Sequence, residues 1–176
     1  MLLGLMGTVL DITDRMTASA ALKESEERNR TLINNIPGAV YRCKADKDWT
    51  LIFQSDAIFN VTGYAIDHPI HHEDWRLIHP DDRARVDHET TAAIAQRQPF
   101  EVEYRLLHAD GGIRWVLETG QPITDATGTV QLIDGVLTDI TRRKQSETRL
   151  QDLASREGLI NRISNQIRES LELQPI

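Results

Sequence analysis

With 176 residues, 40% of them hydrophobic, the chain is long enough for one domain with its own core and for extensions outside it. The net charge of −7 argues against nucleic acid as the main partner, since phosphate binding needs a basic face. The single Cys43 excludes an internal disulfide framework and favours a reducing compartment, and no apolar run approaches the roughly 20 residues that cross a bilayer. We therefore expect a cytoplasmic protein without a membrane segment in this part of the chain.

One short sequence occurs twice. Residues 7–13 (GTVLDIT) return 128 positions later as residues 135–141 (GVLTDIT), and three further identities follow in the same register up to residue 28. Each copy has the pattern of a strand end followed by a polar, helix-prone run. A repeat of about one domain length indicates a tandem array of similar domains joined by helices, so residues 1–15 are interpreted as the tail of an upstream unit.

The first half of the chain predicts a helix, two strands and a broken helical stretch. Residues 16–35 are rich in Ala, Leu, Glu and Arg, which favour a helix, and a Pro-Gly pair ends it. Short strands are predicted at 39–43 and 50–53, on either side of a polar turn. From residue 54 to residue 98 the pattern is helical but interrupted by glycine and proline.

A helix start is recognisable at residues 79–83 (HPDDR). Proline suits the first turn of a helix, and the carboxylates of Asp81 and Asp82 suit the positive end of its dipole. Val86 and Ile94 then recur at helical spacing, so one face of this helix can lie on a sheet.

The hydrophobic period then changes to two, which is typical of strands with one apolar face. Residues 100–106 alternate apolar and charged side chains, and 108–112 (HADGG) predict a hairpin turn. The next strand alternates apolar Ile113, Trp115 and Leu117 with polar Arg114 and Glu118. A further turn at 125–128 leads to the last strand, 130–140.

Residues 142–174 predict a second helix, whose apolar residues follow the three-four spacing of a weak coiled-coil seam. Glu157 and Ser164 occupy two seam positions, and Gly158 interrupts the run. The residues that we expect at a parallel homodimer interface are Leu150, Leu153, Ile160, Ile167 and Leu171. The same spacing is equally typical of an amphipathic helix that only connects two domains.

Four segments in this order resemble a PAS domain that ends in a PAC motif: residues 75–83 (WRLIHPDDR), 100–106 (FEVEYRL), 110–116 (DGGIRWV) and 135–141 (GVLTDIT). The resemblance implies an α+β fold, in which a five-stranded antiparallel sheet carries helices over one face and encloses a small pocket. An apolar sheet face needs such a cover, and the helical stretch before residue 98 can provide it.

The resemblance also divides the chain. It places the PAS domain at residues 36–143, after a linker helix at 16–35 and before a signalling linker helix at 144–176. Residues 161–171 are similar to the helix that opens a GAF domain in cyanobacterial-type sensor kinases.

Two groups of candidate functional residues follow. The candidates for lining a ligand pocket are Trp75, Ile78, Val86, Ile94, Tyr104, Leu106 and Trp115, although aromatic residues at these spacings are also typical of plain core. Asp139, Ile140 and Thr141 end the last strand, where they would cap the outgoing helix and relay a change in the sheet to it. Capping alone also accounts for these residue types.

No cofactor or metal is predicted, and the small-molecule ligand stays unknown. His68, His71 and His72 cluster in a loop-like stretch without the further ligand that a metal site needs. His88 lies in the helix where haem-binding PAS domains place their axial ligand, but both of its sequence neighbours are charged. The cysteine motif of flavin-binding light sensors is absent, and Cys43 is interpreted as a small strand or core residue.

These features predict a sensory and dimerisation PAS module of a cytoplasmic signal-transduction protein. The parent is expected to be a sensor histidine kinase of a two-component system, with a cyclic-di-GMP cyclase or phosphodiesterase as the alternative. The chain itself is expected to have no enzyme activity, because it contains no phosphate-binding loop, nucleophile elbow, kinase signature or cyclase signature. Its partners would be a second copy and the output domain of the same polypeptide. A ligand-free protein-interaction scaffold is the other interpretation.

Overall fold

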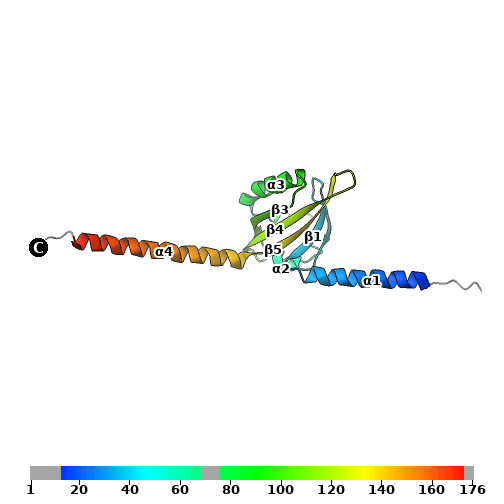
Figure 1. Cartoon of the computed structure of the whole chain (residues 1–176), viewed down its shortest axis with the longest axis horizontal. Coiled ribbons are helices and arrows are strands. Elements are labelled where there is room, and N and C mark those ends of the chain that lie inside the picture. Colours follow the sequence, from blue (N-terminus) through cyan, green and yellow to red (C-terminus); the bar gives the residue numbers. More distant parts are fainter. Residues whose placement is uncertain (1–12, 69–75, 173–176) are drawn as a thin grey trace, which may run out of the picture. The chain divides into compact units, whose positions relative to one another are not determined.

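The computed structural model of the chain describes residues 13–68 and 76–172, with side chains described for residues 16–68 and 76–163. The chain divides into two compact units, one up to Pro37 and one from Gly38 onward. Figure 1 shows the elements of each unit. The first copy of the repeated motif, apart from its final threonine, lies outside the described residues.

The first unit contains α1 (Thr13–Asn34), at the place where composition predicts a helix. Its described side chains are exposed, except for the half-buried Ile33. Glu24 and Arg28 form an ion pair one helical turn apart, at 2.8 Å. An exposed pair of this kind contributes only a few tenths of a kcal/mol. Within its own unit, α1 is therefore stabilised by helix propensity and a local ion pair, and its surface is exposed.

The second unit is built on a five-stranded antiparallel sheet. The strands lie in the order β2-β1-β5-β4-β3, so the first and last strands of the chain segment, β1 and β5, are neighbours at the centre. The α+β architecture expected from the sequence is confirmed. The strands are β1 (Ala39–Lys44), β2 (Leu51–Gln54), β3 (Phe100–Leu107), β4 (Ile113–Thr124) and β5 (Val130–Asp139).

The alternation predicted for β3 is confirmed, because its apolar residues are buried and face the core. The predicted alternation of β4 is wrong. Val116 pairs with Tyr104 and is fully buried, and Glu118 faces the same side, whereas Trp115 belongs to the other face of the strand. Cross-strand partners share a face of the sheet, so the register of the β3–β4 hairpin decides which residues of β4 point inward.

Two helices, α2 (Ile58–Thr62) and α3 (Pro80–Ala95), lie against the sheet: α2 contacts β1 and β5, and α3 contacts β3. Gly63 ends α2 with φ +77°, in the left-handed region where glycine is favoured. The helix start predicted at residues 79–83 is confirmed. His79 caps α3 by accepting from the backbone N–H of Asp81, and proline occupies the first turn.

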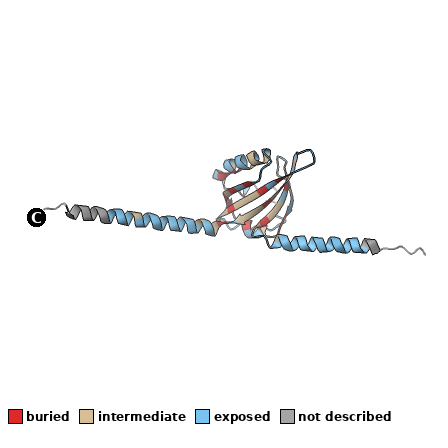
Figure 2. Cartoon of the chain, in the orientation of Figure 1, coloured by how far each residue is buried: buried red, intermediate tan, exposed pale blue. Residues whose placement is uncertain are grey.

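The core lies between the inner face of the sheet and these helices. Figure 2 shows the buried residues concentrated in the strands and on the inward sides of α2 and α3, while the two terminal helices are almost wholly exposed. The buried apolar cluster consists of Ala39, Cys43, Ile58, Val61, Leu77, Val86, Phe100, Val102, Tyr104, Leu106, Val116 and Ile133. Each fully buried Val, Leu, Ile or Phe side chain stabilises the folded state by about 1.5–3 kcal/mol, because its apolar surface is removed from water.

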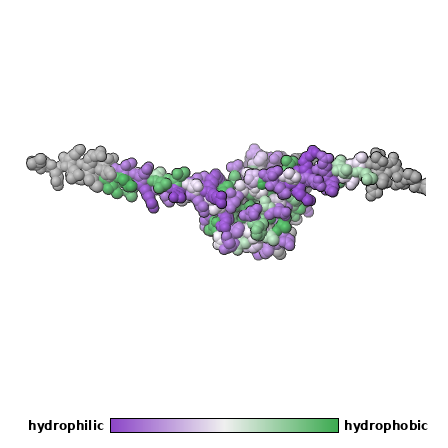
Figure 3. Space-filling model, turned by 90° about the horizontal axis from the view of Figure 1, so that it is seen from below, coloured by the Kyte–Doolittle hydropathy of each residue, from purple (hydrophilic) through white to green (hydrophobic). Residues whose placement is uncertain are grey.

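The chain leaves the sheet through α4 (Thr141–Glu172), a helix of 32 residues. Its apolar side chains are exposed: Leu150 at 67% and Ile160 at 62% of their surface. Figure 3 shows green, apolar surface interrupting the purple, polar surface along this helix. None of the helices in the described ranges is both long and apolar enough to cross a membrane.

Candidate functional site

A cavity of about 430 Å³ lies between the inner face of the sheet and the helices α2 and α3. All five strands contribute side chains to its wall, together with the loop between β1 and β2 and residues 77 and 78. Most of these side chains are aliphatic or aromatic. A mainly apolar cavity of this volume is typical of a site for a small molecule.

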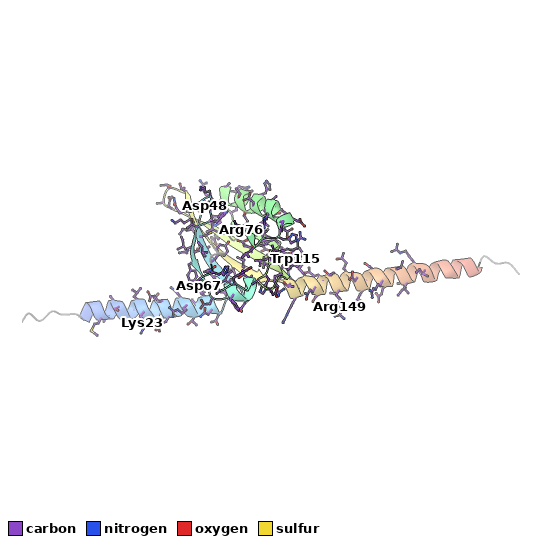
Figure 4. All side chains as sticks on the ribbon, turned by 180° about the vertical axis from the view of Figure 1, so that it is seen from behind. Lys23, Asp48, Asp67, Arg76, Trp115 and Arg149 are labelled. Carbon is purple, nitrogen blue, oxygen red and sulfur yellow. The ribbon has the colours of Figure 1, made fainter. Side chains whose placement is uncertain are left out.

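Five of the seven residues predicted to line a pocket lie around this cavity: Ile78, Val86, Ile94, Tyr104 and Leu106. Trp75 lies outside the described residues. Trp115 does not line the cavity, because it belongs to the opposite face of β4, and Figure 4 shows it beside the start of α4. Its indole ring lies under the ammonium group of Lys144, 5.2 Å from the ring centroid.

Glu118 brings a carboxylate into the wall of the cavity. Tyr41 donates its hydroxyl to Oε1 of Glu118 at 2.5 Å, and Tyr104 donates to Oε2 at 2.9 Å. Burial raises the pKa of Glu118 above its usual value of 4.5, and the two tyrosine hydrogen bonds oppose that rise. Burial and the nearby carboxylate raise the pKa of Tyr41 well above 10.0, so its hydroxyl remains a donor at neutral pH.

The register of the sheet brings these polar groups together. Glu118 pairs with Val102 on β3 and with Leu137 on β5. Tyr41 on β1 pairs with Gly135 on β5, where the missing side chain leaves room for the tyrosine ring to reach across β5 toward β4. The hydrogen bonds therefore link three strands, β1, β3 and β4, through a single carboxylate.

Neither Glu118 nor Tyr41 was predicted as a site residue. Glu118 has the pattern of a solvent-facing residue when β4 is judged by hydrophobic alternation alone. The hairpin between β3 and β4 could have identified Glu118. Leu107 pairs with Ile113 across a five-residue loop, so the residue five positions before Leu107, the buried Val102, pairs with the residue five positions after Ile113, Glu118. Paired residues share a face of the sheet, so Glu118 faces the core.

Other polar side chains at the cavity have partners nearby. Arg83 donates to the backbone carbonyl oxygens of Ile78 and Arg76, at 2.9 and 3.1 Å. Lys47 lies 3.8 Å from Asp48, and both side chains are largely exposed in the loop between β1 and β2. Within the described residues, no Lys, Arg or His forms an ion pair with Glu118.

The three residues predicted to relay a signal lie where β5 passes into α4. The side chain of Asp139 accepts from the backbone N–H of Thr141 at 2.8 Å, which caps the new helix. Thr141 Oγ1 accepts from the backbone N–H of Trp115 at 2.9 Å, and the N–H of Ile140 donates to the carbonyl of Trp115 at 2.8 Å. The start of α4 is thus bonded to the main chain of β4.

Charged side chains strengthen the same junction. Glu103, on the outer side of β3, accepts from Lys144 at 2.6 Å and from Arg143. These bonds lower the pKa of Glu103 below its usual value, with Lys144 as the larger cause. Positive side chains are unfavourable in the first turn of a helix, so a carboxylate of the sheet offsets that repulsion.

The described histidines do not form a metal site. His68 is exposed and its ring lies tilted against that of Tyr64, with 4.7 Å between ring centroids, and His88 is exposed on α3. His71 and His72 lie outside the described residues. Across residues 13–68 and 76–172, no three His, Cys, Asp or Glu side chains gather closely enough to hold a metal ion.

The residues predicted for a dimer helix all belong to α4. Leu150, Leu153 and Ile160 are exposed, while the side chains of Ile167 and Leu171 lie outside the described part. Sequence reasoning left out Leu159 and Ile163, which are also exposed and widen the apolar stripe.

Residues 51–137 match the PAS fold family. The chain contains a PAS domain. The described residues form the PAS fold and the two helices that flank it. Residues 13–68 and 76–172 therefore contain no separate catalytic domain.

Similar proteins include sensors. The "uncharacterized protein y4lL" of Sinorhizobium fredii is 34% identical over 141 residues, which are 80% of this chain and 17% of that protein. The methyl sulfide methyltransferase-associated sensor of Methanosarcina acetivorans is 30% identical over 149 residues, 80% of this chain and 14% of that protein. This chain therefore spans less than a fifth of the length of either relative.

Among solved structures, a sensory box histidine kinase/response regulator from Burkholderia thailandensis matches with a TM-score of 0.61 and 29% identity, covering 76% of this chain and 98% of that chain. This PAS domain is therefore related to the PAS sensors of histidine kinases and other signalling proteins, and it is a sensory module.

Proposed function

We propose that this PAS domain senses a small molecule in its cavity and passes the change to α4. The observation that carries the proposal is that the cavity and the helix junction share two strands. On β4, Glu118 faces the cavity and Trp115, three residues away, holds the start of α4. On β3, Tyr104 bonds to Glu118 and its neighbour Glu103 bonds to α4.

The mechanism follows from these bonds. An occupant that displaces Glu118 or Tyr104 shifts the backbone of β4 or β3. The hydrogen bonds at Trp115 must then move with the strand or break, and either result changes how the first turn of α4 is held. The ligand shifts the balance between two packings by the difference in its affinity for them.

Within this proposal the parent protein is a cytoplasmic sensor histidine kinase, and α4 leads to an output domain of the same polypeptide. The similarity to a sensory box histidine kinase supports this choice over a cyclic-di-GMP enzyme. Two copies associate in parallel through α4, whose exposed leucines and isoleucines would be buried in such a dimer. The chain itself acts as a regulator and not as an enzyme.

Cys43 offers a direct test, because it is the chain's single cysteine and lines the cavity. Benzyl methanethiosulfonate would couple a benzylthio group to Cys43: the thiolate sulfur forms a disulfide bond, and methanesulfinate leaves. Mass spectrometry shows when every molecule carries the group. We expect hydrogen exchange of the amides in residues 141–150 to change on labelling.

The matched control is Cys43→Ser treated with the same reagent, in which exchange should stay as it is without reagent. Full labelling of the wild type with unchanged exchange in residues 141–150 would contradict the relay. That outcome would favour a ligand-free interaction role for the domain.

A further inference from the structure

Glu118 places a carboxylate in the wall of a cavity that is otherwise mainly apolar. Its two oxygens each accept one tyrosine hydrogen bond. A carboxylate has about four acceptor positions, so the two tyrosines leave part of this capacity unused. Both tyrosines act as donors, an arrangement that suits the ionised carboxylate.

A buried negative charge is normally matched by a cation. Glu118 has no such partner among the described residues. Of the two cationic side chains at the cavity, Arg83 donates to backbone carbonyls, and Lys47 is largely exposed in a loop, 3.8 Å from Asp48. The cavity lining contains three carboxylates, of Asp48, Asp87 and Glu118, and Asp48 is the one beside Lys47. The lining therefore has one more carboxylate than it has cationic side chains, in a wall that is otherwise mainly apolar.

The remaining wall suits a molecule with an apolar body. Aromatic rings of Tyr41, Trp49, Phe100 and Tyr104 line the cavity together with aliphatic side chains. Aromatic faces attract cations, and a cavity of about 430 Å³ holds a compact ring with a short chain. An anionic head group would instead meet the like charge of Glu118, for which the described residues supply no ion-pair partner.

We propose that the cavity takes a small apolar amine, whose ammonium group binds Glu118 between the hydroxyls of Tyr41 and Tyr104. This inference rests on the proposed sensing role of the cavity and adds the ligand's chemical class. The ammonium group supplies the missing positive charge and fills the open acceptor positions, while the apolar body lies against the aromatic and aliphatic wall. Amine binding would directly alter the charge balance and hydrogen bonding of the carboxylate that links β1, β3 and β4.

The test uses three probes of similar shape: 2-phenylethylamine, 2-phenylethanol and 3-phenylpropanoate. At neutral pH the amine is charged, because alkyl amines titrate near pH 10. Calorimetry with the purified chain should show the amine binding about tenfold or more tighter than the alcohol, with the acid weakest, since charge-assisted hydrogen bonds are about twice as strong as neutral ones. This ranking in the wild type tests the inference without any substitution.

Two variants then locate the preference. Glu118→Gln keeps the shape and removes the charge, so the amine should bind it no better than the alcohol does. Glu101→Gln removes the charge of an exposed carboxylate on β3 that does not line the cavity, and it should retain the wild-type preference. Circular dichroism checks that both variants fold.

The inference is wrong if the acid or the alcohol binds the wild type as tightly as the amine, if none of the probes binds, or if Glu101→Gln and not Glu118→Gln abolishes the preference. The proposed relay is judged separately by the exchange of residues 141–150 after labelling of Cys43, so either idea can fail while the other stands.

Discussion

The ring of Tyr41 lies over Gly135, its partner on the neighbouring strand β5, so closely that a β-carbon at Gly135 would overlap the ring. Phe100 stands in the same relation to Gly120 on β4. In both pairs the missing side chain makes space on the inner face of the sheet for an aromatic ring from the next strand. The position of Tyr41, and with it the hydrogen bond to Glu118, depends on that space.

Gly135→Ala should therefore displace Tyr41 and weaken its bond to Glu118. Inserting a methyl group into a packed interior costs about 1–3 kcal/mol. We expect the free energy of unfolding, measured by urea titration, to fall within that range. A variant as stable as the wild type would show that the ring can move aside without loss.

Gly158→Ala is the matched control. Gly158 lies inside α4, and a β-carbon there would meet no atom within 4 Å apart from the adjacent residues and the local helix backbone. Alanine favours a helix over glycine by about 0.5–1 kcal/mol, so this variant should keep the stability of the domain and increase helicity.

The raised pKa of Glu118 gives its contribution to stability a definite sign. A carboxyl whose pKa is higher in the folded than in the unfolded state holds its proton in the folded state over the interval between the two values. The folded state then binds more protons, so the free energy of unfolding falls as pH rises from the usual value of 4.5 through the raised pKa. Urea titrations from pH 4 to pH 8 should show the wild type losing stability relative to Glu118→Gln over this interval. Parallel pH profiles for the two proteins would contradict the prediction.

The pKa of Asp82 is lowered in the folded state, so its effect on stability has the opposite pH dependence. Its carboxylate accepts from the side chain of Arg105 at 2.7 and 2.9 Å, which lowers its pKa from 3.8 to about 2. One pKa unit corresponds to about 1.4 kcal/mol, so Asp82→Asn should cost about 2 kcal/mol at neutral pH. The stabilisation is present above pH 3.8 and is lost as pH falls through about 2, so the two proteins should converge in acid.

Asp81→Asn provides the comparison for this pair. The side chain of Asp81 is 70% exposed and lies 3.4 Å from Arg105. An exposed ion pair of this kind contributes about 0–1 kcal/mol, so the loss should be much smaller than for Asp82→Asn. Equal losses in the two variants would show that the orientation of Asp82 toward Arg105 has no special role.

The proposed parallel dimer predicts moderate self-association through α4. Leu150→Ser/Ile160→Ser removes two apolar side chains from the stripe, each of which contributes roughly 1.5–3 kcal/mol when buried. Light scattering at micromolar concentration should find a dimeric wild type and a largely monomeric double variant. A monomeric wild type, or a double variant that remains dimeric, would reduce α4 to a connector.

Local patterns predicted most of the fold. The alternation of Phe100, Val102, Tyr104 and Leu106 predicted both a strand and its buried face, since residues with a period of two share one side of a sheet. The helix start at His79 was predictable for a similar reason: proline, a capping side chain and early carboxylates act within one turn.

The site was harder to predict, because it depends on contacts between distant residues. Glu118 becomes a cavity residue through the register of β3 with β4, and Tyr41 reaches it only because residue 135 has no side chain. Trp115 was expected at the pocket for its size and aromatic character. The register puts it on the opposite face, against Lys144 and the start of α4.

Only Ile140 separates the end of β5 at Asp139 from the start of α4 at Thr141, and Ile140 is itself buried. The sheet therefore fixes the angular phase of α4 as well as its starting point. Each residue of an α-helix turns by roughly 100°, so a single insertion after Thr141 would rotate the stripe that contains Leu150 by more than a quarter turn, whereas seven inserted residues would return it nearly to its original direction. The end of β5 thus determines the direction in which the apolar stripe of α4 faces.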